Sequence, residues 1–220
     1  MAFKGLQNLD YLIDKWSGFL ADLLTIPKIP IKSDNRIKVY GRFVKTDNSI
    51  YIVYNKKKFA NDHKLKVNVL QTITHEYRHY YQAYCIAYEK EMAEIEGKER
   101  IDLWKKDLMN YKPYGSKEYY NQDVEIDSVS FTMMLFLYFD VIVIEDYNIY
   151  DENKIDNRLK SLLMDYTKEE VIDSLASVDL KYDVLKDYLI RMINDRKIID
   201  NFWNKINKKK EGKNNGYCKR

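Results

Sequence analysis

The sequence lacks several features that mark common protein classes. Its two cysteines, Cys85 and Cys218, lie far apart in a chain of 220 residues, so no structural disulfide is expected and a reducing cytoplasm is the expected compartment. No run of about 20 apolar residues could span a membrane. The first hydrophobic segment is interrupted by Asp10, Asp14 and Asp22, unlike a secretory leader. We therefore expect a cytoplasmic protein with no membrane partner.

The chain also lacks a large charge excess and several catalytic motifs. A formal net charge of +3 is too small to indicate a specific nucleic-acid partner. No glycine-rich phosphate loop ends in Gly-Lys-Ser/Thr, and no Gly-x-Ser-x-Gly elbow occurs. Hydrophobic residues make up 45% and charged residues 32%, which is typical of a globular protein. We expect a single domain over residues 1–220, with a flexible basic tail at about 205–220.

Hydrophobic spacing predicts an α+β fold that is mostly helical. Residues 9–26 have the apolar periodicity of a helix, and residues 37–44 and 49–54 have strand character with a polar turn between them. The two strands are therefore expected to form a hairpin. Further helices are expected from about 65, over 98–109, from about 121 to 143, over 152–166, from a capping box at 167–170, and over 179–198.

The strongest signal in the chain is a match to H-E-x-x-H at Thr74-His75-Glu76-Tyr77-Arg78-His79. Residues four apart on a helix differ by about 40° in direction, so His75 and His79 can aim two imidazoles at one metal ion. Glu76 lies about 100° from His75, close enough for its carboxylate to act as general base on a water held by the metal. The alternative is a helix that carries two histidines on a polar face. Because this motif holds two of the 3 His in the chain, we predict a zinc site.

The motif helix has a second face that is apolar and tyrosine-rich. The residues opposite His75 are Leu70, Ile73, Tyr77, Tyr80, Tyr84 and Tyr88. We expect this face to pack on the hairpin, while the histidines face a cleft. Arg78 points away from the metal side and is expected to pair with a carboxylate.

A catalytic zinc site needs a third protein ligand. Cys85 would lie about 15 Å along the helix axis from His75, so it is expected to be a small buried residue. The helix after residue 121 is nearly apolar but carries Asp123, Glu125 and Asp127 in its opening turns. Any of these three carboxylates could be the third ligand, could orient a histidine, or could simply be a favourable charge at a helix N-terminus.

In these two segments the sequence resembles the zincin metallopeptidases, specifically the gluzincin-like group, and is similar to compact ImmA/IrrE-type proteins of phages and mobile elements. The resemblance covers His75-Glu76-x-x-His79 and, more weakly, Glu125-Ile126-Asp127. It departs from the thermolysin-type pattern at Val129, where that pattern has Asp. The resemblance implies a small sheet packed on the motif helix, Glu125 as third ligand, and one Zn²⁺ per chain.

The same resemblance implies a zinc-dependent peptidase acting on a peptide or protein substrate, with Glu76 as the general base. Such a hydrolase also needs a hydrogen-bond donor for the oxyanion, and we predict Tyr120, with Tyr119 as its neighbour and alternative. The strand at 49–54 is expected to hold an extended substrate by strand addition. The alternative function is an inactive regulatory or interaction protein that keeps the zincin fold.

Overall fold

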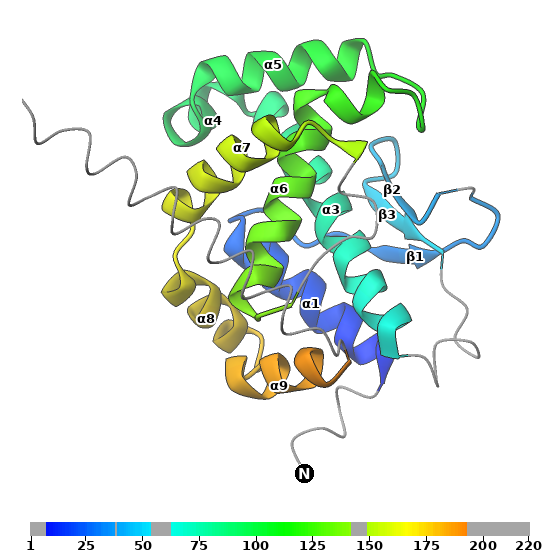
Figure 1. The fold of residues 1–220 in the computed structure, drawn as a ribbon, viewed down its shortest axis with the longest axis vertical. Helices are drawn as coiled ribbons and strands as arrows, with labels where there is room; N and C mark the ends of the chain where they lie inside the picture. The colour runs from blue at the N-terminus through cyan, green and yellow to red at the C-terminus, as the bar shows by residue number, and fades with distance from the viewer. Residues whose placement is uncertain (1–7, 38, 54–62, 142–148, 193–220) are drawn as a thin grey trace, which may run out of the picture.

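The computed structural model describes residues 8–37, 39–53, 63–141 and 149–192 (Figure 1). Within these ranges helices dominate and a small sheet lies beside them, so the fold is α+β and mostly helical, as predicted. The basic tail at about 205–220 and the expected ends of two helices at 143 and 198 lie outside the described residues. No described helix combines the length and the hydropathy needed to cross a membrane.

The elements follow the predicted order closely. The helices are α1 (Leu9–Leu23), α3 (His63–Ala87), α4 (Glu89–Glu96), α5 (Lys98–Met109), the short 3-10 helix η1 (Tyr119–Asn121), α6 (Asp123–Tyr138), α7 (Glu152–Asp165), α8 (Lys168–Ser177) and α9 (Tyr182–Met192). The strands are β1 (Ile31–Ser33), β2 (Gly41–Val44) and β3 (Ser49–Ile52). The predicted capping box of Thr167 and Glu170 opens α8.

The sheet contains the predicted hairpin and one further strand. β2 pairs antiparallel with β3, and β1 pairs parallel with the other side of β3. β1 was not predicted, because its three residues carry no alternating pattern of their own. Since β3 is paired on both sides, the prediction that the strand at 49–54 holds a substrate is wrong.

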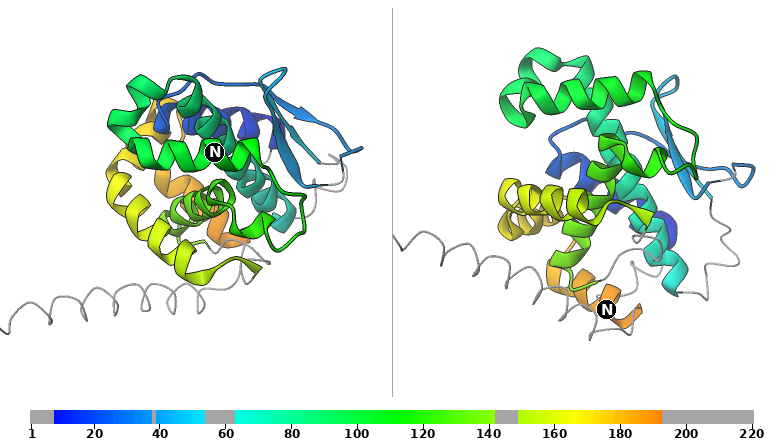
Figure 2. Two further views of the ribbon diagram at one scale, coloured as in Figure 1. Left: turned by 90° about the horizontal axis from the view of Figure 1, so that it is seen from above. Right: turned by 45° about the horizontal axis from the view of Figure 1, so that its top comes forward.

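α3 lies at the centre, with α6 along one side and the sheet on another (Figures 1 and 2). α1 packs against α3 beside the motif. Trp16 of α1 is fully buried, and its indole N–H donates to Thr74 Oγ1 at 3.0 Å. The hydroxyl of Tyr77 accepts the backbone N–H of Ile29 at 3.2 Å. These two bonds fix the turn of α3 that carries His75.

The histidine face of α3 is covered, whereas an open cleft was expected. All residues of α6 from Val124 to Leu137 are buried, so this helix needs cover on every side, and α3 provides part of it. The side chains of His75 and His79 are consequently only 19% and 11% exposed. Cys85 is fully buried on α3, as predicted for a small core residue.

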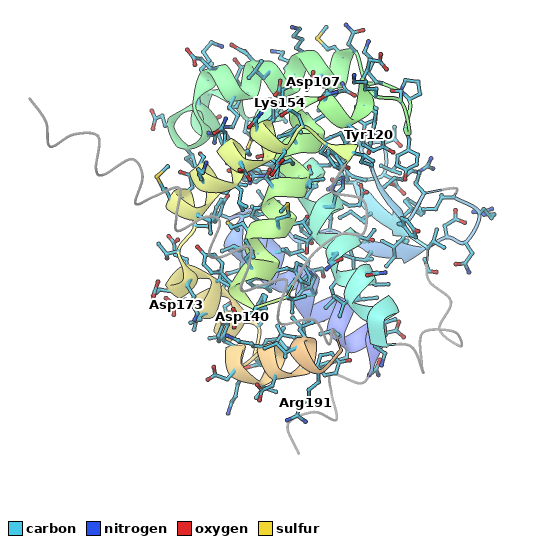
Figure 3. The ribbon with its side chains drawn as sticks, viewed as in Figure 1. Asp107, Tyr120, Asp140, Lys154, Asp173 and Arg191 are labelled. Carbon is cyan, nitrogen blue, oxygen red and sulfur yellow. The ribbon has the colours of Figure 1, made fainter. Side chains whose placement is uncertain are left out.

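The N-terminus of α6 is capped from α5. α6 begins after Gln122, whose side chain makes no capping bond. Instead Asp107 Oδ2 accepts the backbone N–H groups of Asp123 and Val124. In Figure 3, Asp107 is drawn at this end of α6. A carboxylate here satisfies orphan N–H groups and complements the helix dipole, so it holds the first turns of α6 in place.

Candidate metal centre

His75, His79 and Glu125 bring their potential ligand atoms to one point, all within 4.8 Å of one another. The two Nε2 atoms of the histidines lie 3.0 Å apart. Glu125 Oε2 lies 3.4 Å from His75 Nε2, and Glu125 Oε1 lies 3.2 Å from His79 Nε2. A tetrahedral site with bonds of about 2.0 Å separates its ligand atoms by about 3.3 Å. The spacing of this triad therefore fits a metal ion.

The surroundings of Glu125 also fit a cation. Its side chain is 0% exposed, and Oε2 accepts no hydrogen bond from any residue in the described ranges. A buried carboxylate oxygen without a donor is unfavourable, because it has given up hydration without replacement. A cation between the three side chains would satisfy this oxygen and both imidazole nitrogens together. The triad can therefore hold a metal ion.

The donor set is two imidazole nitrogens and one carboxylate. Sets of two histidines and one glutamate occur in catalytic zinc sites, which keep a further position for water or substrate.

Comparison with known proteins adds nothing to this chemistry. No protein-family model, curated protein or solved structure matches this chain.

Glu76 lies beside the triad and is held by the sheet. Its carboxylate is buried, and Oε2 accepts the backbone N–H of Phe43 in β2 at 2.7 Å. Burial raises the pKa of Glu76, while the nearby His75 and His79 lower it in part. A carboxylate whose pKa is raised binds a proton more readily than an ordinary one. It is therefore better suited to take a proton from water and pass it on.

β2 can approach Glu76 this closely because residue 41 is a glycine. A Cβ atom at Gly41 would lie 2.5 Å from Thr72 Cγ2 and 3.1 Å from Glu76 Cγ. Both distances are shorter than a normal packing contact. The absence of a side chain at Gly41 therefore allows the strand to rest on α3 at the site.

Two tyrosines reach Glu125 of the triad, namely Tyr111 and the predicted alternative Tyr119, whereas Tyr120 does not. The Tyr111 hydroxyl donates to Glu125 Oε1, and 47% of the residue is exposed. Tyr120 instead packs its ring on Tyr119 and Tyr150, with centroids 5.1 and 5.2 Å away, and none of its described contacts reaches the triad. Its labelled position in Figure 3 is near the N-terminal end of α6. Nothing in the spacing of the chain marked Tyr111, because a loop brings it to Glu125.

Arg78 pairs with a carboxylate, as predicted, and it does so in a fully buried network. Its Nε donates to Asp127 Oδ2 at 2.7 Å, and its Nη2 donates to Glu96 Oε1 at 3.2 Å. From α7, Arg158 Nε donates to Asp127 Oδ1 at 2.6 Å. Burial opposes ionisation of Asp127, but the two arginines outweigh it and hold its pKa well below the usual range. Asp127 is therefore engaged by arginines and faces away from the triad.

Asp123, the remaining alternative ligand, also lies outside the triad. Its carboxylate is 40% exposed, and Oδ1 lies 3.7 Å from Lys154 Nζ. Of the three acidic residues at the start of α6, the structure brings only Glu125 to the histidines.

Without a metal ion, the triad holds a proton. Burial disfavours the charged form of His79, but the Glu125 carboxylate outweighs it and raises the pKa of His79 to about 9. The same pairing overcomes the cost of burying Glu125 and holds its pKa well below the usual range. A metal ion must displace this proton, so metal affinity should fall as the pH is lowered.

Proposed function

We propose that this protein is a zinc-dependent metallopeptidase of zincin-like fold, with one zinc ion held by His75, His79 and Glu125. The observation that carries the proposal is the convergence of these three side chains beside the buried carboxylate of Glu76. The three ligands come from α3 and α6, and Glu76 follows directly after the first of them.

When bound, a zinc ion supplies a Lewis acid that polarises a carbonyl group and makes water acidic. Glu76 accepts a proton from the attacking water through the carboxylate oxygen that Phe43 does not occupy. As the C–N bond breaks, Glu76 returns that proton to the leaving amine. The Tyr111 hydroxyl lies at the triad, and turning its one proton from Glu125 to the substrate would let it donate to the developing oxyanion. Burial raises the pKa of Tyr111, which keeps this hydroxyl protonated.

The strand suited to align an extended peptide is β2. It is an edge of the sheet within the described residues, and it lies against Glu76. An edge strand offers backbone groups to an added strand, which β3 cannot do because it has partners on both sides.

The test begins with metal content, measured by mass spectrometry on protein purified without a histidine tag. Wild type should contain about one zinc per chain, and both His79→Ala and Glu125→Gln should lose it. Glu76→Gln should keep the zinc but hydrolyse an unstructured peptide library at least about 100-fold more slowly. A folded wild type that takes up no zinc, or a fully active Glu76→Gln, would contradict the proposal.

An inactive interaction protein is the second candidate, favoured by apolar side chains exposed on α4 and α5. Ile95 is 72% exposed and Met109 is 82% exposed. Zinc retained by every triad-intact variant, with no hydrolysis of any peptide in the library by wild type, would favour this candidate over the peptidase.

A further inference from the structure

A buried glutamine lies between the metal triad and the arginine network. Gln82 is 0% exposed and lies one turn after His79 on α3. Its Oε1 is 2.9 Å from Nδ1 of His79, which is the ring nitrogen on the side away from the triad. Ser128 Oγ is the second neighbour of this nitrogen, at 3.2 Å.

The amide of Gln82 can adopt only one orientation. Its Nε2 lies 2.9 Å from the carbonyl oxygen of Val124 and 2.8 Å from Asp127 Oδ2. Both of these groups are acceptors, so an amide oxygen in that place would face two oxygens with no proton between them. The NH₂ group must therefore face Val124 and Asp127. The amide oxygen is left to face His79.

This orientation determines which nitrogen of His79 carries the proton. Ser128 donates its hydroxyl proton to the Val124 carbonyl at 2.9 Å, so toward His79 it too can only accept. With acceptors on its Nδ1 side, the ring must carry a proton on Nδ1. The neutral ring then has its lone pair on Nε2, which points at His75 and Glu125. That is the tautomer a metal ion needs when Nε2 is the ligand atom.

The orientation of Gln82 is in turn fixed by the ion pairs behind it. Asp127 accepts from Gln82 through the same Oδ2 that accepts from Arg78, and Arg158 holds its other oxygen. We propose that Gln82 is a positioning residue that sets the tautomer and ring orientation of His79 for metal binding, with Asp127 as its anchor. This inference rests on the proposed zinc site, and it gives the buried arginine network a role in that site.

Two variants of the same residue test the role. Gln82→Met keeps the length of the side chain but removes the acceptor, whereas Gln82→Glu keeps an oxygen toward His79 and brings a second carboxylate against Asp127. In competition with a chelator, Gln82→Met should bind Zn²⁺ about 10- to 100-fold more weakly than wild type. Gln82→Glu should bind within about threefold of wild type, although urea should unfold it more readily. A residue that only fills space would give the reverse order, with Gln82→Glu the weaker binder.

A measurement on wild type needs no variant to fold. With only 3 His in the chain, imidazole N–H resonances can be assigned by NMR. In the Zn²⁺-loaded protein, the Hδ1 proton of His79 should be protected from exchange and show a nuclear Overhauser contact to the Gln82 side chain. In Gln82→Met that protection should be lost.

The outcomes separate this inference from the proposed function. Failure of wild type to bind Zn²⁺ would overturn both. Tight Zn²⁺ binding by wild type, together with equal affinity in Gln82→Met or a freely exchanging His79 Hδ1, would overturn the role of Gln82 alone and leave the peptidase proposal standing.

Discussion

Two carboxylates at the start of α6, Glu125 and Asp127, are equally buried but have opposite surroundings. Both carboxylate oxygens of Asp127 accept hydrogen bonds, which come from Arg78, Arg158 and Gln82. Glu125 faces two histidines, Tyr111 and Tyr119, and its Oε2 accepts no close hydrogen bond among the described residues. Asp127 is thus neutralised by the arginines of the protein, whereas Glu125 belongs to a group of side chains that could hold a metal ion.

The helix period explains how neighbours can differ so much. Residues two apart on a helix point about 200° apart, so Glu125 and Asp127 leave α6 on different flanks. One flank meets the histidines of α3, and the other meets Arg78 and the arginine of α7.

The largest expected effect is on stability when the Asp127 pair is broken. Asp127→Asn should lower the free energy of unfolding of the zinc-free protein by about 3–5 kcal/mol, because Arg78 is fully buried and cannot lose its proton. Glu125→Gln is the matched control and should cost only about 2–3 kcal/mol at pH 7, which is the stability that the raised pKa of His79 contributes, because His79 can give up its proton. Urea unfolding measures both. Equal losses in the two variants would mean that the two carboxylates contribute equally to the free energy of unfolding, which would contradict the difference described above.

A pH series separates the two carboxylates further. The pKa of His79 is raised to about 9 in the zinc-free protein, so its contribution to stability is complete below its unfolded value of about 6.5 and is lost as the pH rises through 9. The share of the stability that His79 contributes should therefore fall by about 2–3 kcal/mol between pH 6.5 and pH 9. Glu125→Gln should remove that share, so its stability should fall less steeply over this range than that of wild type.

The arginine pair of Asp127 should not contribute in this window, because arginine stays charged throughout. The comparison is made by urea unfolding in the presence of a chelator. An equally steep fall in Glu125→Gln would show that another group titrates there.

A smaller loss of stability is expected when the close packing of β2 on α3 is disturbed. Gly41→Ala should cost about 1–3 kcal/mol, because its Cβ would overlap Thr72 and crowd Glu76. Gly18→Ala is the control, since its Cβ would lie 3.2 Å from Val178 Cγ1 and a helix favours alanine over glycine by about 1 kcal/mol. Gly41→Ala should also weaken the bond from Phe43 to Glu76, visible as faster amide exchange at Phe43. Unchanged stability and exchange would show that β2 is free to move away.

Much of the site was predictable because its signals are local. The positions of His75, Glu76 and His79 on one helix follow from their spacing alone, and the structure places them on α3. Arg78 was expected to pair with a carboxylate because the same spacing turns it away from the histidines. The choice of Glu125 over Asp123 and Asp127 came from a resemblance, and the spacing within α6 left all three open.

Other features depend on contacts that no local pattern records. Tyr120 packs on Tyr119 and Tyr150 and does not contact the triad, whereas its predicted alternative Tyr119 interacts with Glu125, and the loop after α5 places the unpredicted Tyr111 there as well. Gln82 was not among the predicted site residues, yet it is three residues from His79 and bonds to it. β1 was missed because a strand of three residues is defined by its pairing with β3.

The printed sequence is sufficient for the helical phase that puts two histidines and a glutamate on one turn, and for the apolar helix that must be buried against them. The fold had to supply the rest, namely which carboxylate meets the histidines, which meets the arginines, and how each nitrogen and oxygen is turned. The physical reason is the distance along the sequence between the residues that interact. Helical phase depends on neighbours within a turn, whereas the bonds from α3 to α6 join residues 42 to 49 positions apart, whose encounter depends on how whole elements pack.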